Sequence, residues 1–413
     1  MTAKPRTRTR TRTRTRAPAL DRRLLLLLAL TCAVAVGNLY FAQALTPLAA
    51  AGLGVTPDAA ALAVTATQVG YAAGNFLLVP LGDRLPHRRL LATLLGLTGL
   101  GLLAAGLAPT LPVLAAASGA AGLTSVAAPV IGPLAAGLVA PDRRGEVSGM
   151  LAGGAIGGML LSRAFGGALA EGLGWRAPYL VAAVVILFLA WVLTRTLPAT
   201  PPPTAPAGSY LALLAGTLQL LCTEAELRRS GFYQATVFAG FSAVWTGLAL
   251  LLTGPAYGLG PSAVGLFALV GAATMVCTPL AGRLTDRHGP DPVNLICLLG
   301  TLASAPVLAA GTCGGTVGLV ALVLGTLLLD VAMQCGMVAN TTRVLGLRDD
   351  ARSRLTTAYM TCAYLGGSAG SWLGAHAWDV AGWPGVCGLL AVCATAALLR
   401  HAAVLTGRRQ AAR

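Results

Sequence analysis

The chain has 413 residues, of which 56% are hydrophobic and only 10% charged, and its mean hydropathy is +0.74. Soluble domains carry roughly 25% charged residues, so this composition excludes a water-soluble globular protein and indicates one whose main solvent is lipid. The net charge of +15 does not indicate nucleic-acid binding, because nine of the 29 basic residues lie in the first 23 positions.

Residues 1–23 are dominated by a Thr-Arg repeat, which we expect to be a disordered basic tail because it has few apolar residues to bury. Its arginines precede an apolar run and would bind anionic lipid headgroups. A cleaved signal peptide is the alternative. The apolar run continues well past signal-peptide length without a clear small-residue cleavage site, which favours an uncleaved membrane span.

Twelve long apolar runs follow the tail. About 20 apolar residues cross a bilayer as a helix, and the runs lack the period-2 alternation of barrel strands, so we expect helices. The predicted spans are residues 24–50, 60–82, 90–108, 111–139, 146–170, 177–195, 231–253, 262–282, 292–311, 315–341, 355–378 and 384–405. The sequence therefore predicts an all-α integral membrane protein.

A linker at residues 198–230 separates the sixth and seventh spans. Its Pro-rich beginning predicts a semi-rigid spacer. The stretch at about 209–229 has leucines at helical spacing and charges near its end, which favours an amphipathic helix at the membrane surface over a further span.

The basic residues predict the orientation of the chain. With both termini cytoplasmic, 27 of the 29 basic residues lie on the cytoplasmic side, Arg176 lies in an outer loop and Arg163 lies within a span. Positive charge is enriched on the cytoplasmic side of membrane proteins. We therefore expect a multi-pass protein of the cell (inner) membrane, and we expect it to be a monomer.

Features of the first half recur about 203 to 208 positions later. The Asp-Arg pair of LGDRLPHRR (81–89) returns in AGRLTDRHG (281–289), AGLGVTP (51–57) returns as YGLGPSA (257–263), and the pairs Pro47/Pro255 and Gly174-Trp175/Gly382-Trp383 follow the same order. The chain is therefore expected to form two six-helix bundles, residues 24–197 and 231–405, followed by a tail at 406–413. Because each half has an even number of helices, the two pseudo-repeats should be parallel.

This pattern resembles the major facilitator transporters. GRLTDRHG (282–289) is similar to the family's loop signature G-x-L-x-D-R-x-G-R-R and retains Gly282, Asp286, Arg287 and Gly289, whereas the first-half copy retains Asp83, Arg84, Arg88 and Arg89. The fifth span is similar to that of the drug/proton antiporter branch at Gly149, Gly158, Gly166 and Gly167, but has Ser162-Arg163 where that branch has Gly-Pro. Stretches 38–50 and 241–261 are similar to bacterial efflux permeases.

The resemblance implies that the two Asp-Arg loops act as gates that clamp the halves together and release them. Asp83 and Asp286 would pair with arginines across the loop or lie at a helix N-terminus, where the helix dipole favours an anion. The alternative is that the basic loops only fix the orientation in the membrane, and for Arg88 and Arg89 this is at least as good an explanation.

Polar side chains within spans are candidates for function, because they are costly in lipid and usually face a cavity or a partner. Asp330 is nearly central in the tenth span, with Gln334 one turn away, and it either carries a coupling proton, binds a substrate cation or makes a structural hydrogen bond. Arg163 would bind an anionic substrate group, pair with Asp330 or extend to the outer surface. His376 is expected at the interface, with a proton relay as the alternative. The remaining cavity candidates are Asn38, Gln43, Gln68, Asn75 and Trp245.

We expect a secondary transporter that exports a small organic molecule in exchange for protons. An importer or uniporter, and a membrane sensor that has lost transport, are the alternatives. Lys4 is the only lysine, so no Walker A motif is present. The sequence has no HExxH motif, and its nine cysteines are odd in number without a CxxC pair, which indicates buried thiols. An enzyme, a metal site or a cofactor is not expected.

Overall fold

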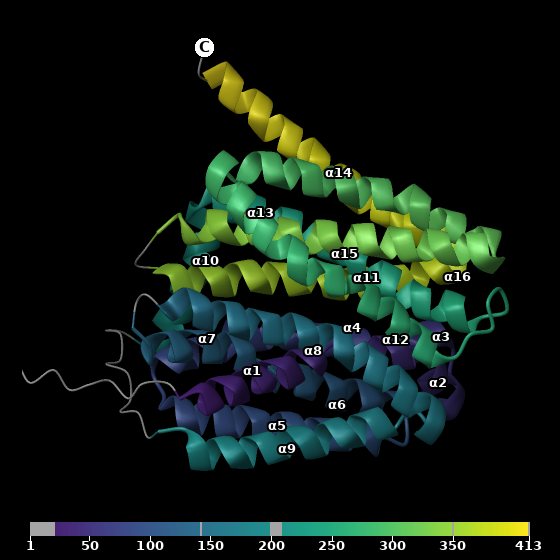
Figure 1. Ribbon diagram of the computed structural model, residues 1–413, viewed down its shortest axis with the longest axis horizontal. Coiled ribbons are helices and arrows are strands. Elements are labelled where there is room, and N and C mark those ends of the chain that lie inside the picture. Colours follow the sequence, from purple (N-terminus) through teal and green to yellow (C-terminus); the bar gives the residue numbers. More distant parts are fainter. Residues whose placement is uncertain (1–20, 141–142, 199–208, 349–350, 412–413) are drawn as a thin grey trace, which may run out of the picture.

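Nearly every described residue lies in a helix, and the long helices run side by side (Figure 1). The computed structural model describes residues 21–140, 143–198, 209–348 and 351–411, and within them no β-strand is present, in agreement with the predicted all-α class. The helices are α1 (Arg22–Gly37), α2 (Phe41–Leu53), α3 (Pro57–Ala60), α4 (Leu62–Leu77), η1 (Val79–Asp83), α5 (His87–Gly106), α6 (Leu111–Thr124), α7 (Ala127–Gly137), α8 (Arg144–Leu173), α9 (Ala177–Thr196), α10 (Tyr210–Thr223), α11 (Ala225–Thr253), α12 (Pro261–Val270), η3 (Gly271–Ala273), α13 (Thr274–His288), α14 (Pro290–Ala309), η4 (Ala310–Cys313), α15 (Gly315–Leu345) and α16 (Arg352–Ala411).

Ten helical stretches of the described chain are long and apolar enough to cross a membrane. Helix α8, the predicted fifth span, is not among them; its sequence contains many glycines and four charged residues, with Arg163 well inside the helix. Helix α16 counts as a single stretch, although its backbone leaves the helical conformation at Gly382 (φ 61°, ψ −150°). A total of twelve spans therefore stays a prediction, which requires that α8 crosses the bilayer and that α16 crosses it twice.

Some predicted spans consist of two helices in line. Helices α1 and α2 meet at a turn formed by Asn38, Leu39 and Tyr40, and α12 joins α13 through the short 3-10 turn η3. A turn within a span interrupts the 3.6-residue period, so residues beyond it face directions that the period does not predict.

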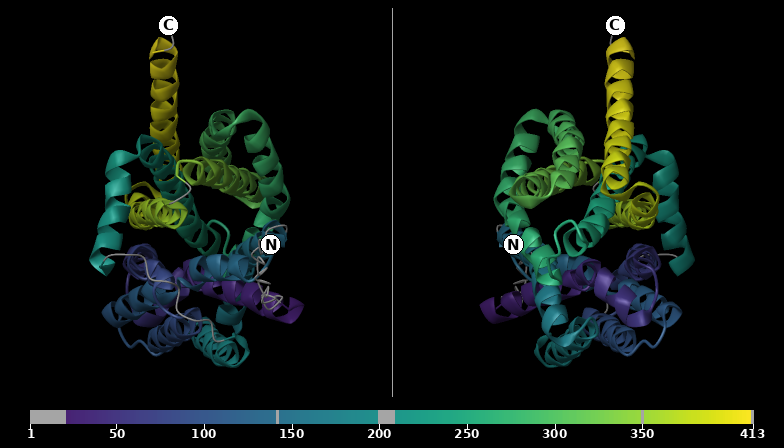
Figure 2. Two further views of the ribbon diagram at one scale, coloured as in Figure 1. Left: turned by 90° about the vertical axis from the view of Figure 1, so that its left-hand side faces the viewer. Right: turned by 90° about the vertical axis from the view of Figure 1, so that its right-hand side faces the viewer.

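Helices α1–α9 lie in one part of the molecule and α11–α16 in the other (Figures 1 and 2). The two parts contact each other through α8 and α12, α4 and α16, and α2 and α11. The first contact is close, because a Cβ atom added to Gly167 would lie 2.4 Å from the carbonyl oxygen of Pro261. Small residues allow this approach where lipid offers no hydrophobic drive for helix packing. The equivalence of the two parts as repeats stays a prediction.

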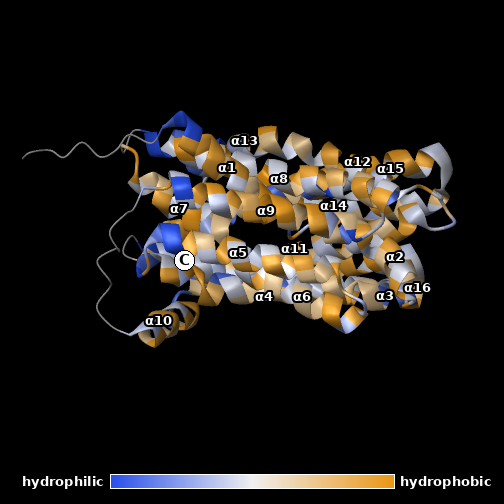
Figure 3. Ribbon diagram, turned by 90° about the horizontal axis from the view of Figure 1, so that it is seen from below, coloured by the Kyte–Doolittle hydropathy of each residue, from blue (hydrophilic) through white to orange (hydrophobic). Residues whose placement is uncertain are grey.

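Hydrophilic residues gather at one end of the helices, where α1 begins and α10 lies (Figure 3). This end carries the loops that contain Asp83 and Asp286, and we call it the basic end; the opposite end is called the far end. Most of the predicted tail 1–23 and the Pro-rich stretch of the linker lie outside the described residues.

Helix α10 has one face packed on the protein and one face exposed. Ser209 caps it by accepting a hydrogen bond from the backbone N–H of Ala212 at 3.1 Å. Leu220 is buried, whereas Leu211 and Leu218 are exposed, as in an amphipathic interfacial helix. Helix α11 begins at Ala225, six residues before the predicted seventh span at 231. Helix α16 continues to Ala411, and its last part leaves the body of the molecule (Figure 2).

Candidate functional site

A cavity of about 300 Å³ lies between the two parts of the molecule. Four of the seven methionines of the chain line it, together with aromatic residues and amides: Met159, Met333, Met337, Met360, Tyr40, Tyr71, Phe238, Tyr364, Asn75, Gln234 and Gln334. No Asp, Glu, Lys, Arg or His is among its described lining residues. A lining of aromatic rings and flexible, polarisable thioethers suits an uncharged and largely apolar ligand.

Aromatic rings from both parts meet at one side of this cavity. The hydroxyl groups of Tyr40 and Tyr364 are 3.3 Å apart, and the ring of Tyr364 packs edge-on against Tyr71, with ring centroids at 4.3 Å. The ring of Phe238 also packs edge-on against Tyr364, with ring centroids at 5.2 Å. In the opposite direction the lining extends along α16 toward the basic end as far as Thr356. The rings therefore close the cavity toward the far end.

Arg163 lies beyond these rings and is fully buried. Its Nε and Nη2 atoms donate hydrogen bonds to Oε1 of Gln43 at 3.1 and 2.7 Å. The guanidinium carbon lies 4.1 Å from the centroid of the Trp245 ring and 4.9 Å from that of Tyr40. Of the alternatives considered for this arginine, extension to the outer surface does not occur, because a hydrogen-bond acceptor and aromatic faces hold the cation inside the protein.

Asp330 lies on the other side of Trp245 and is 3% exposed. Its Oδ1 accepts a hydrogen bond from the indole Nε1 of Trp245 at 3.2 Å. Among the described residues, Asp330 and Arg163 do not form an ion pair within 4.0 Å. The hydrogen-bonding partner of Arg163 is Gln43 and not Asp330, which the sequence had suggested as one alternative. Space for the carboxylate depends on η3, because a Cβ atom on Gly271 would lie 2.6 Å from Oδ2 of Asp330.

We call Gln43, Arg163, Trp245 and Asp330 the buried polar cluster. Gln43 and Arg163 come from one part of the molecule, and Trp245 and Asp330 from the other. Within the described structure, Nη1 of Arg163 and Nε2 of Gln43 have no hydrogen-bond partner. The cluster therefore joins the two parts and retains two buried donors for a water molecule or a ligand.

The other predicted cavity residues have different positions. Asn75 and Gln334 line the cavity, and Nε2 of Gln68 donates across the two parts to the hydroxyl of Ser242 at 3.5 Å. Asn38 does not line it: the turn between α1 and α2 directs this side chain to a groove on the other face of α1. His376 is exposed and stacks on Trp372.

The two predicted gating loops are unequal. Asp83, Arg84 and Arg88 are half-buried, whereas Asp286 and Arg287 are exposed. Neither aspartate caps a helix: α5 is preceded by Pro86 and α14 by Gly289, whose positive φ of 80° favours glycine. No salt bridge of Asp83 or Asp286 occurs among the described residues, but Asp83 interacts electrostatically with Arg354 of the other part.

An ionic cluster that the sequence did not indicate lies at the basic end of α11, α14 and α15. Arg229 contacts Glu226 at 3.2 Å and Asp291 at 2.8 Å, and Arg343 contacts the same two carboxylates. Both arginines are buried, and Arg229 also bonds Tyr233 and the ring of His401. Asp291 lies in the first turn of α14, so this residue, and not Asp286, occupies the helix N-terminus that follows the second Asp-Arg loop. We call Glu226, Arg229, Asp291 and Arg343 the ionic cluster.

Most glycines of the predicted motif in the fifth span lie where α8 packs closely against another helix. A Cβ atom on Gly158 would lie 2.0 Å from the carbonyl oxygen of Ala33, and one on Gly166 would lie 2.9 Å from Cβ of Phe41. Gly167 contacts α12 across the two parts, whereas a Cβ atom on Gly149 would meet nothing within 4 Å. Near Gly167, Oε2 of Glu171 accepts a hydrogen bond from the backbone N–H of Ser262, in the first turn of α12, at 3.2 Å.

Comparison with known proteins gives consistent matches. The sequence profile of the Major Facilitator Superfamily matches residues 26–370. The uncharacterized transporter YgaY of Escherichia coli O157:H7 is 35% identical over 368 residues, which cover 89% of this chain and 92% of the relative. The chloramphenicol resistance protein of Streptomyces lividans is 28% identical over 283 residues, covering 68% of this chain and 70% of that protein. A bacterial homolog to the human lysosomal transporter Spinster, in an inward-facing and occupied conformation, has a TM-score of 0.71 at 14% identity and covers 94% of this chain and 96% of that chain.

Proposed function

The chain belongs to the Major Facilitator Superfamily of membrane transporters, and we propose that it exports a small organic molecule in exchange for protons by alternating access. The observation that carries this proposal is the cavity between the two parts, with a buried carboxylic acid directly beyond it. Such a cavity can face the two sides of the membrane in turn when the parts move relative to each other.

The substrate that this cavity favours is uncharged and aromatic. The lining has no charged side chain among the described residues, and Asn75, Gln234 and Gln334 offer amide hydrogen bonds. Thioethers adapt to ligands of different shapes, which suits a transporter with several substrates. The name of the relative from Streptomyces lividans adds chloramphenicol as the first compound to test.

Asp330 is the group that we propose to carry the proton. It is the acidic residue nearest the cavity along α15, one turn beyond the lining residues Met333 and Gln334. Because Trp245 separates it from Arg163, its carboxylate can take up a proton without breaking an ion pair. Gain and loss of a charge at this position would change which arrangement of the two parts is stable.

We infer that the basic end faces the cytoplasm and that both termini lie there, in the cell membrane, since basic residues concentrate on that side of membrane proteins. The cavity extends toward the basic end and is closed by tyrosines toward the far end, which supports an inward-facing arrangement as part of this proposal. We also propose that the protein is a monomer. The arginines of residues 1–23 would bind anionic lipid headgroups.

Transport by purified protein in liposomes tests the proposal. We expect chloramphenicol and other neutral aromatic compounds to accumulate in vesicles with an acidic interior, and a protonophore to abolish the accumulation. Charged analogues of the same size serve as controls and should be transported less. Accumulation driven by an acidic exterior would instead indicate a proton-coupled importer, flux that is insensitive to the gradient would indicate a uniporter, and no flux of any compound would favour a sensor.

A further inference from the structure

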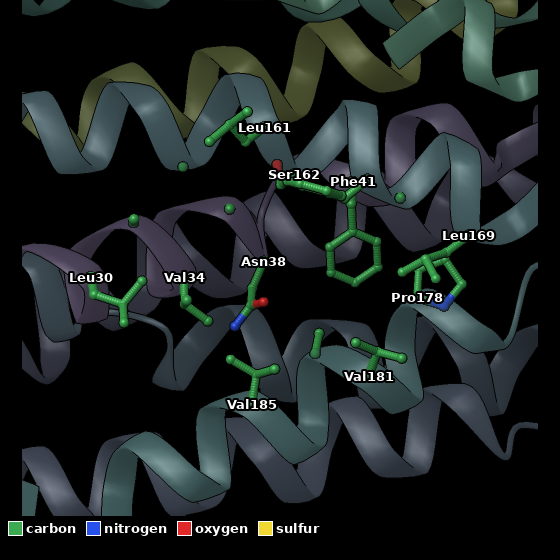
Figure 4. Close-up of a pocket in the computed structure, with 16 residues that line it drawn as sticks. Leu30, Val34, Asn38, Phe41, Leu161, Ser162, Leu169, Pro178, Val181 and Val185 are labelled. Carbon is green, nitrogen blue, oxygen red and sulfur yellow. The ribbon is translucent and has the colours of Figure 1, made fainter. Parts of the chain in front are cut away.

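A second cavity, of about 360 Å³, lies between α1, α2, α8 and α9 (Figure 4). It is a groove on the outer surface of the first part of the molecule, because Leu161, Phe165 and Val181 line it and are exposed, Phe165 by 65%. In a membrane these side chains contact lipid. We call this cavity the lipid-facing groove.

The groove is separate from the central cavity. Its floor is the contact between α1 and α8, where a Cβ atom on Gly37 would lie 3.0 Å from Cβ of Ser162 and one on Gly158 would lie 2.0 Å from the carbonyl oxygen of Ala33. No space for a ligand exists between helices in such contact. The groove and the central cavity therefore lie on opposite faces of the same pair of helices.

One polar group in this apolar groove lacks a partner. Asn38 is 6% exposed, and its Nδ2 atom has no hydrogen-bond partner within the described part of the chain. Figure 4 shows the amide of Asn38 between Val34 and Phe41, directed toward Val185. The hydroxyl of Ser162, in contrast, donates to the carbonyl oxygen of Met159. A buried donor without an acceptor is unfavourable, so a ligand that supplies an acceptor gains free energy at Asn38.

The depth of Asn38 indicates the chemistry of that ligand. The residue lies near the middle of the 32-residue stretch Arg22–Leu53, and therefore near the centre of the bilayer. Phospholipid tails carry no hydrogen-bond acceptor at this depth, and their ester groups lie at the interfaces. The walls of the groove carry no charge, so a charged ligand would not be stabilised there.

We propose that the lipid-facing groove is a second binding site, for an uncharged apolar molecule that dissolves in the bilayer and carries a carbonyl or ether oxygen. The oxygen accepts a hydrogen bond from Asn38 Nδ2, and the apolar body of the molecule lies along α8 and α9. Asn38 belongs to the turn between α1 and α2, which also places Tyr40 in the central cavity and precedes Gln43. A ligand bound in the groove would therefore act on the turn that positions Tyr40 in the wall of the central cavity.

Photolabelling of the full-length protein in phosphatidylcholine nanodiscs tests this site without a transport measurement. Two diazirine probes of equal length are compared, a long-chain ketone and the corresponding hydrocarbon. We expect the ketone to label residues 161–169 and 181–185 about fivefold more than the hydrocarbon does, which is the ratio given by a hydrogen bond of about 1 kcal/mol.

Three variants make the outcome decisive. Asn38→Leu removes the donor and should make labelling by the two probes equal, whereas Ser162→Ala, whose hydroxyl bonds its own helix, should keep the preference for the ketone. Ala182→Phe fills the groove and should exclude both probes. Equal labelling of the wild-type protein by ketone and hydrocarbon, or a preference that survives Asn38→Leu, would overturn the proposal.

Discussion

Arg163 and Asp330 carry opposite charges but do not neutralise each other directly. Each has a neutral partner from a different helix, Gln43 for the arginine and the indole of Trp245 for the aspartate. The ring of Trp245 contacts both, since the guanidinium lies over its face and its N–H bonds the carboxylate. This arrangement holds a cation inside the protein, and the change of charge that we propose for the carboxyl group would break no direct ion pair.

Replacement of Asp330 by Asn tests whether this residue couples transport to the proton gradient or only helps to bind the substrate. The amide oxygen can still accept the hydrogen bond from Trp245, so the buried polar cluster stays intact, but the side chain cannot release a proton. We expect loss of transport driven by a pH gradient, while exchange of labelled for unlabelled substrate without a gradient continues. As a control, Gln334→Leu alters the cavity one turn away and should weaken binding without abolishing coupling. Gradient-driven accumulation by Asp330→Asn at the wild-type level would refute the role of Asp330.

Gln43→Leu tests what holds the buried arginine. The substitution leaves Nε and Nη2 of Arg163 without their acceptor, and an unsatisfied buried donor costs about 1–3 kcal/mol, or more when it is charged. We expect a lower unfolding temperature in detergent. Gln68→Leu is the matched control, since the 3.5 Å contact of Gln68 with Ser242 is at the limit of a hydrogen bond. Equal stability of the two variants would mean that Gln43 does not stabilise Arg163.

The sequence indicated the charged members of the site better than the neutral ones. Asp330 and Arg163 are conspicuous because charge is rare in an apolar span. The methionines and Tyr364 gave no such signal, since thioethers and rings occur equally in packed cores. Asn38 was assigned to the wrong cavity because the turn at residues 38–40 changes the direction of the side chains beyond α1, and no period in the sequence reveals that turn.

At the scale of helices, Gly167 controls how closely the two parts meet. Gly167→Ala places a Cβ atom 2.4 Å from the carbonyl oxygen of Pro261, so α8 and α12 must separate. We expect the variant to disfavour the arrangement that is closed at the far end, and to make a cysteine introduced at Ser262 more reactive toward a membrane-impermeant maleimide. Gly149→Ala, on the same helix with nothing near the new Cβ atom, should leave that reactivity unchanged. If the two alanine variants react equally, the contact does not close the far end.

Asp291 and Asp286 should behave differently although they are close in sequence. Asp291→Asn leaves buried Arg229 and Arg343 with one carboxylate instead of two, and breaking such a pair costs about 3 kcal/mol. Asp286 is exposed, so Asp286→Asn should leave the unfolding temperature unchanged and affect only transport, as expected for a gating residue. Destabilisation by Asp286→Asn, or none by Asp291→Asn, would contradict these assignments.

Hydropathy predicted where helices occur but not how they are joined or divided. Its runs coincide closely with α5 and α9, which are uninterrupted apolar helices. It did not indicate the turn within the first span. It also did not indicate the early start of α11, because the charged residues Glu226 and Arg229 lower the hydropathy of a helical turn that tertiary contacts stabilise. The ionic cluster was missed for a different reason: its members come from three helices and share no local motif.

At the scale of the whole molecule, the contacts between the two parts are those expected of one state in an alternating cycle. At and beyond the central cavity, the parts are held by Tyr40 with Tyr364, by the buried polar cluster and by Glu171 with Ser262. Toward the basic end, the cavity separates them as far as Thr356. The family resemblance could be predicted from the sequence, and so could Asn75 and Gln334 as residues of the cavity. The contacts between the two parts could not, because they depend on distances between residues far apart in the chain.

Alternating access predicts that the two ends move in opposite directions, and pairs of spin labels can measure this. Leu173 and Val317, each 72% exposed, lie at the far end of different parts, and Leu85 and Leu284 lie at the basic end. The exposed cysteines Cys222 and Cys313 would first be replaced, since an exposed thiol also reacts with the label. Gly167→Ala should lengthen the distance at the far end and shorten the one at the basic end, because a population shift toward the other state changes both together. Two distances that lengthen together would instead mean that the parts simply separate, and the mechanism of alternating access would not apply to this chain.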